Sequence, residues 1–335
     1  MDLPDVASEL LLESQSYIGI PLALLGAVFL SLGTQYQHRG VAKVEVLVGS
    51  SQAGLGARQL LALLRRPSWV LGTIMLGLAI VLQLASLWFA PLIVVQPLGA
   101  VALVITAVLN SRLSKVPLDR ATIRAIIICV VGVGAFVTVA AFVAVQKGVK
   151  ESELTTVVVL LAGVLALWGV LYAIFRRKAG PVFYIVAAGM LFGFVATLAK
   201  VVIGRVQTLI KVIERNAVTG EVWSFGSAEW LTILCIMGLI TASLIGTYFV
   251  QSAHANGPPD LVVAGLTVID PIVAVAIGIV VLNEAAGAPW WAIAAFILTG
   301  AVAVFGVFQL AKHHPQMSAE YRESGELRLG PRGER

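Results

Sequence analysis

Charged residues are scarce in this 335-residue chain: Asp, Glu, Lys and Arg make up 12% of it, whereas 59% of its residues are hydrophobic. Average soluble domains carry about 25% charged residues. A water-soluble fold of this length cannot bury so much apolar surface, so most of the chain must lie in lipid. The composition therefore predicts an integral membrane protein.

Cysteine and histidine are also rare, with two and four residues. Cys129 and Cys235 lie within apolar runs and form no CxxC pattern, which argues against a disulfide framework and a zinc site. The chain has no Walker sequence, which argues against an ATP-driven pump. We expect neither an enzyme nor a bound cofactor. The four histidines fall at membrane interfaces or in the C-terminal tail: His38, His254, His313 and His314.

Long apolar runs, in contrast, fill most of the chain. A helix that spans the hydrocarbon core of a bilayer, about 30 Å thick, needs about 20 largely apolar residues. These runs predict an all-α polytopic membrane protein with about nine transmembrane helices. The stretches 38–67 and 204–229 are too polar to span, and we expect interfacial helices or ordered loops there. The predicted spans are 17–37, 68–89, 91–113, 121–145, 155–175, 182–203, 230–251, 259–282 and 290–311.

Lys and Arg are concentrated in alternate connections, at 38–67, 112–124 and 176–178, and in the C-terminal tail. Positive charge collects on the cytoplasmic side of membrane proteins. The pattern predicts a multi-pass protein of the cell membrane, with residues 1–16 outside and a disordered cytoplasmic tail at 312–335. It also accounts for the basic composition without nucleic acid as a partner. Membrane lipids are the expected surroundings, and the sequence leaves a homodimer open.

Two parts of the chain resemble each other in the same order. Gly26-Ala-Val-Phe corresponds to Gly189-Met-Leu-Phe, and Pro91-Leu-Ile-Val-Val corresponds to Pro259-Asp-Leu-Val-Val. Related units that are separated by an odd number of spans have inverted topology. The sequence therefore predicts an inverted-repeat bundle made of a first repeat, a central helix and a second repeat, at 17–145, 146–181 and 182–311.

One motif points to a family. Phe89-Ala90-Pro91, followed by Gln96 and Pro97-Leu98-Gly99-Ala100, resembles the FAP…PLGA signature of the NIPA-like magnesium transporters. The similarity extends over about residues 17–311. The family belongs to the drug/metabolite transporter superfamily, also called DMT or EamA-like. The resemblance implies a secondary permease whose paired repeats work by alternating access.

One departure from the family concerns the cargo. NIPA-like proteins tend to carry a glutamate in the second span, where this chain has Ile80, and Gln83 holds their nearby asparagine position. Magnesium prefers carboxylate or water oxygens, so Ile80 removes an anionic group from a cation path. Magnesium or another divalent cation, a small metabolite, and a small amphipathic organic cation or drug all stay open as cargo. A non-transporting membrane scaffold is a further alternative.

Asp270 is the most informative residue, because an ionisable side chain near the bilayer midplane costs several kcal/mol. It lies about 16 Å into its span at 1.5 Å per residue. Pro271 lacks a backbone donor and frees a carbonyl near Thr267, on the same helix face. These oxygens predict a cation or proton site with Asp270 as the metal ligand. A carboxyl that only fixes helix packing is the simpler alternative.

Lys200 is the second ionisable residue within a span, and the repeat aligns it with Gln37. Its stem could reach the headgroups, and its estimated depth differs from that of Asp270 by about 10 Å, which argues against a direct pair. Interhelical packing would also explain most polar residues of the spans. The predicted substrate or ion site consists of Asp270, Thr267, Gln83, Gln96, Thr241, Lys200, Thr197 and Gln37.

Overall fold

The computed structural model describes residues 18–37, 39–40, 64–114, 117–146, 148–175, 178–219 and 226–312. Within these residues all regular secondary structure is helical, and nine helices are long and apolar enough to cross a membrane. This confirms the prediction of an all-α polytopic membrane protein. The predicted outer segment 1–16, most of the stretch 38–67 and the tail beyond Lys312 lie outside the described residues.

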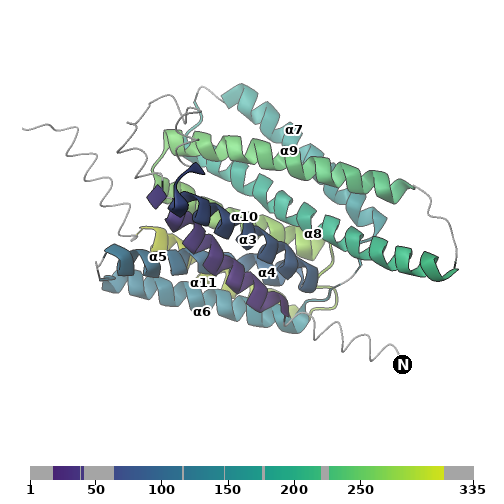
Figure 1. Cartoon of the computed structure of the whole chain (residues 1–335), viewed down its shortest axis with the longest axis horizontal. Helices are drawn as coiled ribbons and strands as arrows, with labels where there is room; N and C mark the ends of the chain where they lie inside the picture. The colour runs from purple at the N-terminus through teal and green to yellow at the C-terminus, as the bar shows by residue number, and fades with distance from the viewer. Residues whose placement is uncertain are drawn as a thin grey trace, which may run out of the picture.

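The helices form an elongated bundle in which they run roughly along one another (Figure 1). A first helix, Ile18–Gln37, precedes those labelled in the figure. The labelled helices are α3 (Pro67–Phe89), α4 (Leu92–Leu98), α5 (Ala100–Ser114), α6 (Arg120–Val143), α7 (Glu151–Phe175), α8 (Pro181–Thr219), α9 (Ser227–Asn256), α10 (Pro259–Val280) and α11 (Trp290–Lys312).

Local signals fix several helix starts. Pro67 and Pro259 each lie in the first turn of their helix, where the missing backbone N–H has no intrahelical partner to lose. Before α6, the carboxylate of Asp119 accepts the backbone N–H of Thr122 at 2.9 Å. These residues end the polar connections and place each apolar run in the bundle.

The predicted third span is interrupted in the structure. α4 ends at Leu98 and α5 begins at Ala100, with Gly99 between them. Pro97 has no backbone N–H and cannot bond the carbonyl one turn back, which weakens the helix at this point. The interruption faces the centre of the bundle, because Gly99 and Ala100 line a cavity there.

The prediction of a separate interfacial helix or loop from residue 204 onward is wrong as far as Thr219. α8 continues through this part as one helix of 39 residues, which is about 58 Å long at 1.5 Å per residue. The physical reason lies in Arg205, whose side chain is only 8% exposed and pairs with Glu229 of α9 at 3.5 Å. A charge that the sequence pattern assigned to the membrane interface is therefore buried between two helices.

α6 and α11 cross with their backbones in close approach. A Cβ atom added to Gly132 would lie 2.5 Å from the backbone nitrogen of Ala303, and one added to Gly306 would collide with the backbone of Cys129. The contacts are reciprocal, since Cys129 precedes Gly132 by the same interval as Ala303 precedes Gly306. A local two-fold axis between two helices produces this pattern. Only glycine permits the crossing at this distance.

Glycines also set the other close contacts. The first helix lies against α3, where a Cβ atom on Gly33 would be 3.0 Å from the carbonyl oxygen of Gly72. The two glycines that the repeat aligns have different neighbours, since Gly26 faces α3 whereas Gly189 faces Ile269 of α10. The two units therefore do not pack identically around these positions.

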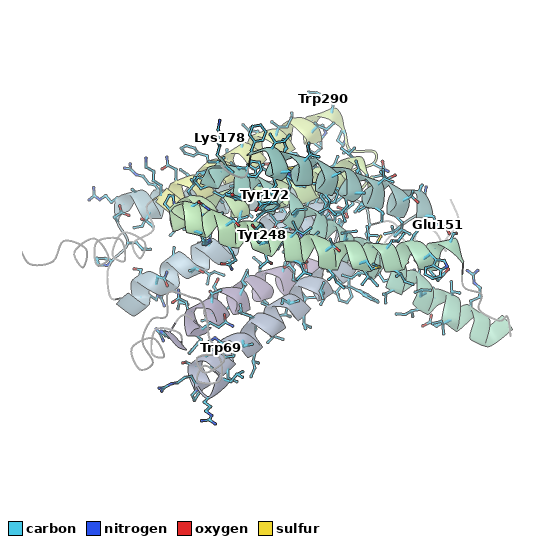
Figure 2. All side chains as sticks on the ribbon, turned by 90° about the horizontal axis from the view of Figure 1, so that it is seen from above. Trp69, Glu151, Tyr172, Lys178, Tyr248 and Trp290 are labelled. Atoms are coloured by element: carbon cyan, nitrogen blue, oxygen red, sulfur yellow. The ribbon has the colours of Figure 1, made fainter. Side chains whose placement is uncertain are left out.

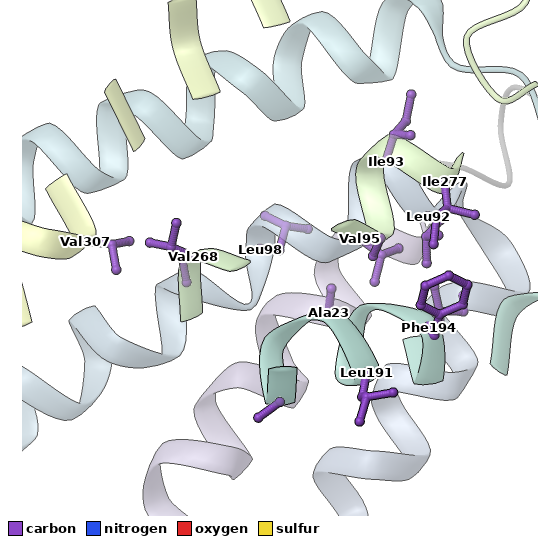
Figure 3. Packing of buried hydrophobic residues seen from close by; sticks show 14 of the residues in the cluster. Ala23, Leu92, Ile93, Val95, Leu98, Leu191, Phe194, Val268, Ile277 and Val307 are labelled. Carbon is purple, nitrogen blue, oxygen red and sulfur yellow. The ribbon is translucent and has the colours of Figure 1, made fainter. Parts of the chain in front are cut away.

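The outward faces of the bundle are apolar, as a lipid environment requires. Phe142 and Trp290 are 79% and 82% exposed. Figure 2 shows Trp290 and Trp69 at the periphery, and Tyr172 of α7 beside Tyr248 of α9, whose hydroxyl oxygens lie 2.7 Å apart. The interior is filled by aliphatic side chains such as those that Figure 3 shows from α4, α8 and α10.

We predict that Gly132→Ala destabilises the protein by about 1–3 kcal/mol, because the added methyl group collides with backbone that cannot rotate away. Gly134→Ala on the same helix is the matched control, since a Cβ atom there meets nothing within 4 Å. Thermal unfolding in detergent measures both variants. Equal unfolding temperatures for the two would contradict the close crossing of α6 and α11.

Candidate functional site

A cavity of about 460 Å³ lies at the centre of the bundle. The first helix, α3, the α4–α5 interruption, α8 and α10 all contribute to its walls. Small residues form much of the lining, so the helices leave space between them. Ile80 and Leu84 of α3 also line the cavity and are 61% and 41% exposed, so this wall of the cavity is also part of the outer surface of the bundle.

Four of the residues predicted from the sequence meet in this cavity: Asp270, Thr267, Gln83 and Gln96. They come from α10, α3 and α4, which are far apart in the chain. Asp270 is the one charged residue among those that line the cavity, and the rest of the lining is largely apolar. An aqueous or ionic occupant would therefore be bound by one carboxylate, two amides and one hydroxyl.

The carboxylate of Asp270 has unused hydrogen-bonding capacity. Its Oδ1 atom is buried and has no hydrogen-bond partner among the described residues. The hydroxyl of Thr267, one turn earlier, donates to the carbonyl of Val263 at 2.8 Å, which leaves the Thr267 oxygen able to accept or to bind a cation. Pro271 cannot donate to the Thr267 carbonyl. α10 thus contributes Asp270 and Thr267, two residues with side-chain oxygens, to the cavity wall.

α8 fixes the position of this part of α10. A Cβ atom on Gly193 would lie 2.7 Å from the Cβ atom of Val273 and 3.0 Å from the backbone carbonyl oxygen of Asp270. Thr197 is fully buried on α8, and its hydroxyl donates to the carbonyl of Gly193 at 2.9 Å. Thr197 therefore lies behind the cavity wall and not in the lining.

Two other predicted site residues lie away from the cavity. Gln37 donates from its side-chain amide to the hydroxyl of Thr73 at 3.0 Å, near the other end of α3. Thr241 is exposed on α9. Neither is among the residues that line the cavity.

Lys200, the remaining predicted residue, is buried at the turn between α3 and α4. Its ammonium group donates to the carbonyl oxygens of Leu87 and Ala90, at 2.6 and 2.8 Å. It is 6% exposed, so its stem does not reach the membrane surface. The carbonyl end of α3 carries partial negative charge, which a cation stabilises.

Glu284, which no sequence pattern predicted as a site residue, occupies the other side of the same turn. Its carboxylate oxygens accept the backbone N–H groups of Leu92 and Ile93 at 2.8 and 2.9 Å, at the start of α4. The side chain is 4% exposed and interacts electrostatically with Lys200. Burial raises the pKa of the Glu284 carboxyl, whereas Lys200 and the two amides counter part of that shift.

Further groups converge on this turn. The side-chain amides of Gln146 and Gln207 both donate to the carbonyl of Trp88 at 2.9 Å. The backbone N–H of Val145 donates to the carbonyl of Glu284 at 2.7 Å. α3, α4, α8, the residues after α6 and the connection from α10 to α11 are thus joined at one place. We call this arrangement, centred on Phe89–Pro91, the charged turn.

Sequence position explains why Glu284 was missed. It follows the apolar run of α10 by only a few residues, within Asn283-Glu284-Ala285, where a charge normally indicates the membrane interface. Asn283 offers one signal, because its φ of 51° marks a tight turn that folds the connection back onto the bundle. An asparagine in a connection is common in turns, so its presence in the sequence does not reveal that the next residue is a buried carboxylate.

Among the described residues, no three His, Cys, Asp or Glu side chains come together as a metal-binding group. A cation in the central cavity would therefore bind Asp270 with neutral oxygens and water. This arrangement differs from an all-protein cage, because water molecules would complete the coordination of the ion.

Comparisons with known proteins indicate the family of the chain. The model of the magnesium transporter NIPA family matches residues 14–315. An uncharacterized protein of Corynebacterium glutamicum is 26% identical over 270 residues, which cover 80% of this chain and 85% of that protein. A probable magnesium transporter of Arabidopsis thaliana, NIPA4, is 31% identical over 121 residues, 36% of this chain and 34% of that protein. No solved structure matches the chain.

The family match covers all the described helices, the central cavity and the charged turn. The nine helices that can span a membrane within the described residues agree with a multi-pass transporter. The chain therefore belongs to the NIPA magnesium transporter family and is an integral membrane protein.

Proposed function

We propose that this protein is a permease that moves a hydrated divalent cation, with magnesium as the first candidate, through the central cavity. The single observation that carries the proposal is Asp270, whose buried Oδ1 atom has no hydrogen-bond partner among the described residues and whose side chain lines the cavity. A carboxylate held in an apolar bundle without a protein partner is costly unless it serves a polar species.

The dimensions of the cavity support a cation that keeps its water. Magnesium dehydrates reluctantly and commonly binds through one or two carboxylates while several water molecules stay attached. Six waters of about 30 Å³ each occupy about 180 Å³. The cavity of about 460 Å³ has room for such an ion. Gln83, Gln96 and Thr267 would hydrogen-bond to its water shell while Asp270 supplies the charge.

We further propose that transport follows alternating access between two inverted repeats of the drug/metabolite transporter type. The reciprocal Gly132–Ala303 and Gly306–Cys129 contacts support this idea, because they relate the last helix of each predicted repeat by a local two-fold axis. In the orientation predicted from Lys and Arg, with the N-terminus outside, the charged turn would lie on the outer side of the membrane.

An organic cation is the second candidate cargo, and one observation favours it. The walls of the cavity carry large apolar side chains, including Ile80, Leu84 and Phe192, and its volume suits a small amphipathic molecule. A sealed and apolar centre would instead have supported a non-transporting scaffold. The open cavity around a carboxylate favours a transporter of either cargo.

We predict that Asp270→Asn lowers magnesium uptake into proteoliposomes by about tenfold or more, because the loss of one charge interaction of about 1.4 kcal/mol changes an equilibrium tenfold. Glu214→Gln is the matched control, since Glu214 is exposed on α8 far from the cavity. A fluorescent magnesium indicator inside the vesicles measures uptake by both variants and by the unchanged protein. Unchanged uptake in Asp270→Asn would remove this carboxylate from the transport path.

We also predict that Ile80→Glu raises magnesium uptake relative to the uptake of an organic cation, because it adds a second carboxylate to the cavity that contains Asp270. Ile80→Gln controls for polarity without charge. The measurement is competition between magnesium and a quaternary ammonium compound in the same vesicles. The organic cation is the cargo if both variants lose its uptake and neither they nor the unchanged protein take up magnesium.

A further inference from the structure

We propose that Lys200 and Glu284 are positioning residues that hold the charged turn closed over one end of the cavity, and that this end opens when Lys200 leaves the α3 carbonyls. The proposal deepens the permease function and rests on it for the identity of the cargo. It assigns a role to Glu284, which the transport site at Asp270 does not use.

The charged turn lies directly beside the cavity. Leu87 belongs to both, because its side chain lines the cavity and its carbonyl accepts a hydrogen bond from Lys200. Ala199, which also lines the cavity, is the residue before Lys200. On the other side of the turn, Gln96 lines the cavity in the same short helix whose first N–H groups Glu284 binds. The turn therefore forms the end of the cavity toward Phe89–Pro91.

The contacts that close this end join separate parts of the chain. Lys200 comes from α8 and Glu284 from the connection after α10, whereas the groups that they bind belong to α3 and α4. A movement of α3 and α4 relative to α8 and α10 would have to break these hydrogen bonds. Because both charged side chains are buried, each bond is made in surroundings where water cannot readily replace it.

Lys200 and Glu284 each bind a helix end whose partial charge is opposite to their own, in addition to attracting each other. The ammonium group meets carbonyl oxygens, and the carboxylate meets N–H groups. Charge-assisted hydrogen bonds of this kind are stronger than neutral ones. The carbonyl oxygens of Leu87 and Ala90 already hold a cation, so a second cation that enters from this end meets repulsion from Lys200. An arriving cation therefore favours the state in which Lys200 has moved away.

A nearby ion pair provides a matched control. Arg205 lies on α8 one to two turns beyond Lys200, is similarly buried and pairs with Glu229. It does not line the cavity and does not touch the charged turn. Replacing Arg205 therefore shows whether the loss of any buried charge on α8 is enough to change the labelling rate.

Cysteine labelling tests the proposal independently of the cargo. In the full chain with Cys129 and Cys235 replaced by alanine, a reporter cysteine is introduced at Ala199 on the cavity wall. A charged, membrane-impermeant methanethiosulfonate is added to proteoliposomes. A separate reporter at Lys150, which is exposed and follows Gln146 of the charged turn by four residues, identifies the side of the vesicle that this end faces.

We expect slow labelling of the Ala199 reporter from that side, and labelling at least about tenfold faster in Lys200→Met and in Glu284→Gln, since a lost interaction of about 1.4 kcal/mol changes an opening equilibrium tenfold. Arg205→Met should leave the rate unchanged. Unaltered rates in both charged-turn variants would overturn the proposal, as would an equal rise in Arg205→Met. Glu284→Gln keeps the size of the side chain and carries the test if Lys200→Met does not fold.

A second readout separates this proposal from the proposed function. Thermal unfolding of the same proteins with and without magnesium chloride should show stabilisation in Lys200→Met and none in Asp270→Asn. If no variant responds to magnesium while the labelling rates change as expected, the cargo assignment fails and the role of the charged turn stands. If magnesium stabilises the protein through Asp270 while the labelling rates stay constant, the cargo assignment stands and the role of the charged turn fails.

Discussion

The structure depends on satisfying the backbone groups that are left open where α3 ends and α4 begins. Lipid offers no hydrogen bonds, so every buried carbonyl and N–H group must find a partner within the protein. Lys200 supplies donors for the carbonyls of Leu87 and Ala90, and Glu284 supplies acceptors for the N–H groups of Leu92 and Ile93. The sharp change of chain direction at Phe89–Pro91 is possible inside the bundle because these two charges compensate it.

This requirement gives the family signature a physical meaning. Ala90 contacts the first helix so closely that a Cβ atom on Gly19 would collide with it, and Pro91 needs no partner for an N–H group that it lacks. A larger residue in place of Ala90 would separate the helices, and a residue with an N–H group in place of Pro91 would add one more donor to satisfy. Phe89-Ala90-Pro91 therefore forms a turn whose open backbone groups two buried charges can satisfy.

Periodicity predicted the helices, and four of the eight site residues named from the sequence line the cavity. Asp270, Thr267, Gln83 and Gln96 could be placed from composition and from a rise of about 1.5 Å per residue, because each lies within a span and near its middle or outer half. The same arithmetic argued against contact between Lys200 and Asp270, and the hydrogen bonds of Lys200 lie at the α3–α4 turn instead. Single-helix properties placed these residues within the spans, but they also selected Thr241, Gln37 and Thr197, which do not line the cavity.

Sequence patterns failed where a charge at the end of a span turns inward. Glu284 and Arg205 both look like interfacial charges in sequence, yet they are 4% and 8% exposed. The partners of Glu284 are 191 and 192 residues away, and those of Arg205 lie on the next helix, so only the three-dimensional packing reveals them. Thr241 shows the opposite case, because a hydroxyl in the middle of α9 is exposed to the surroundings of the bundle. The rotation of a helix about its own axis determines which of its side chains are buried. The apolar residues of α9 are spread around the whole helix, so its sequence does not indicate which face is buried.

α8 and α10 both extend from the cavity toward the charged turn. Gly193 allows α8 to contact the backbone of Asp270, and Lys200 lies two turns further along the same helix. α10 continues from Asp270 for about 15 Å to Val280, at 1.5 Å per residue, and the connection that carries Glu284 follows it. Gly278 keeps this end close to α4, since a Cβ atom there would lie 3.0 Å from both Glu284 Oε2 and Ile93 Cγ2. A shift of α10 that accompanies binding at Asp270 would therefore change the position of Glu284 relative to α4, because a helix transmits displacement along its axis.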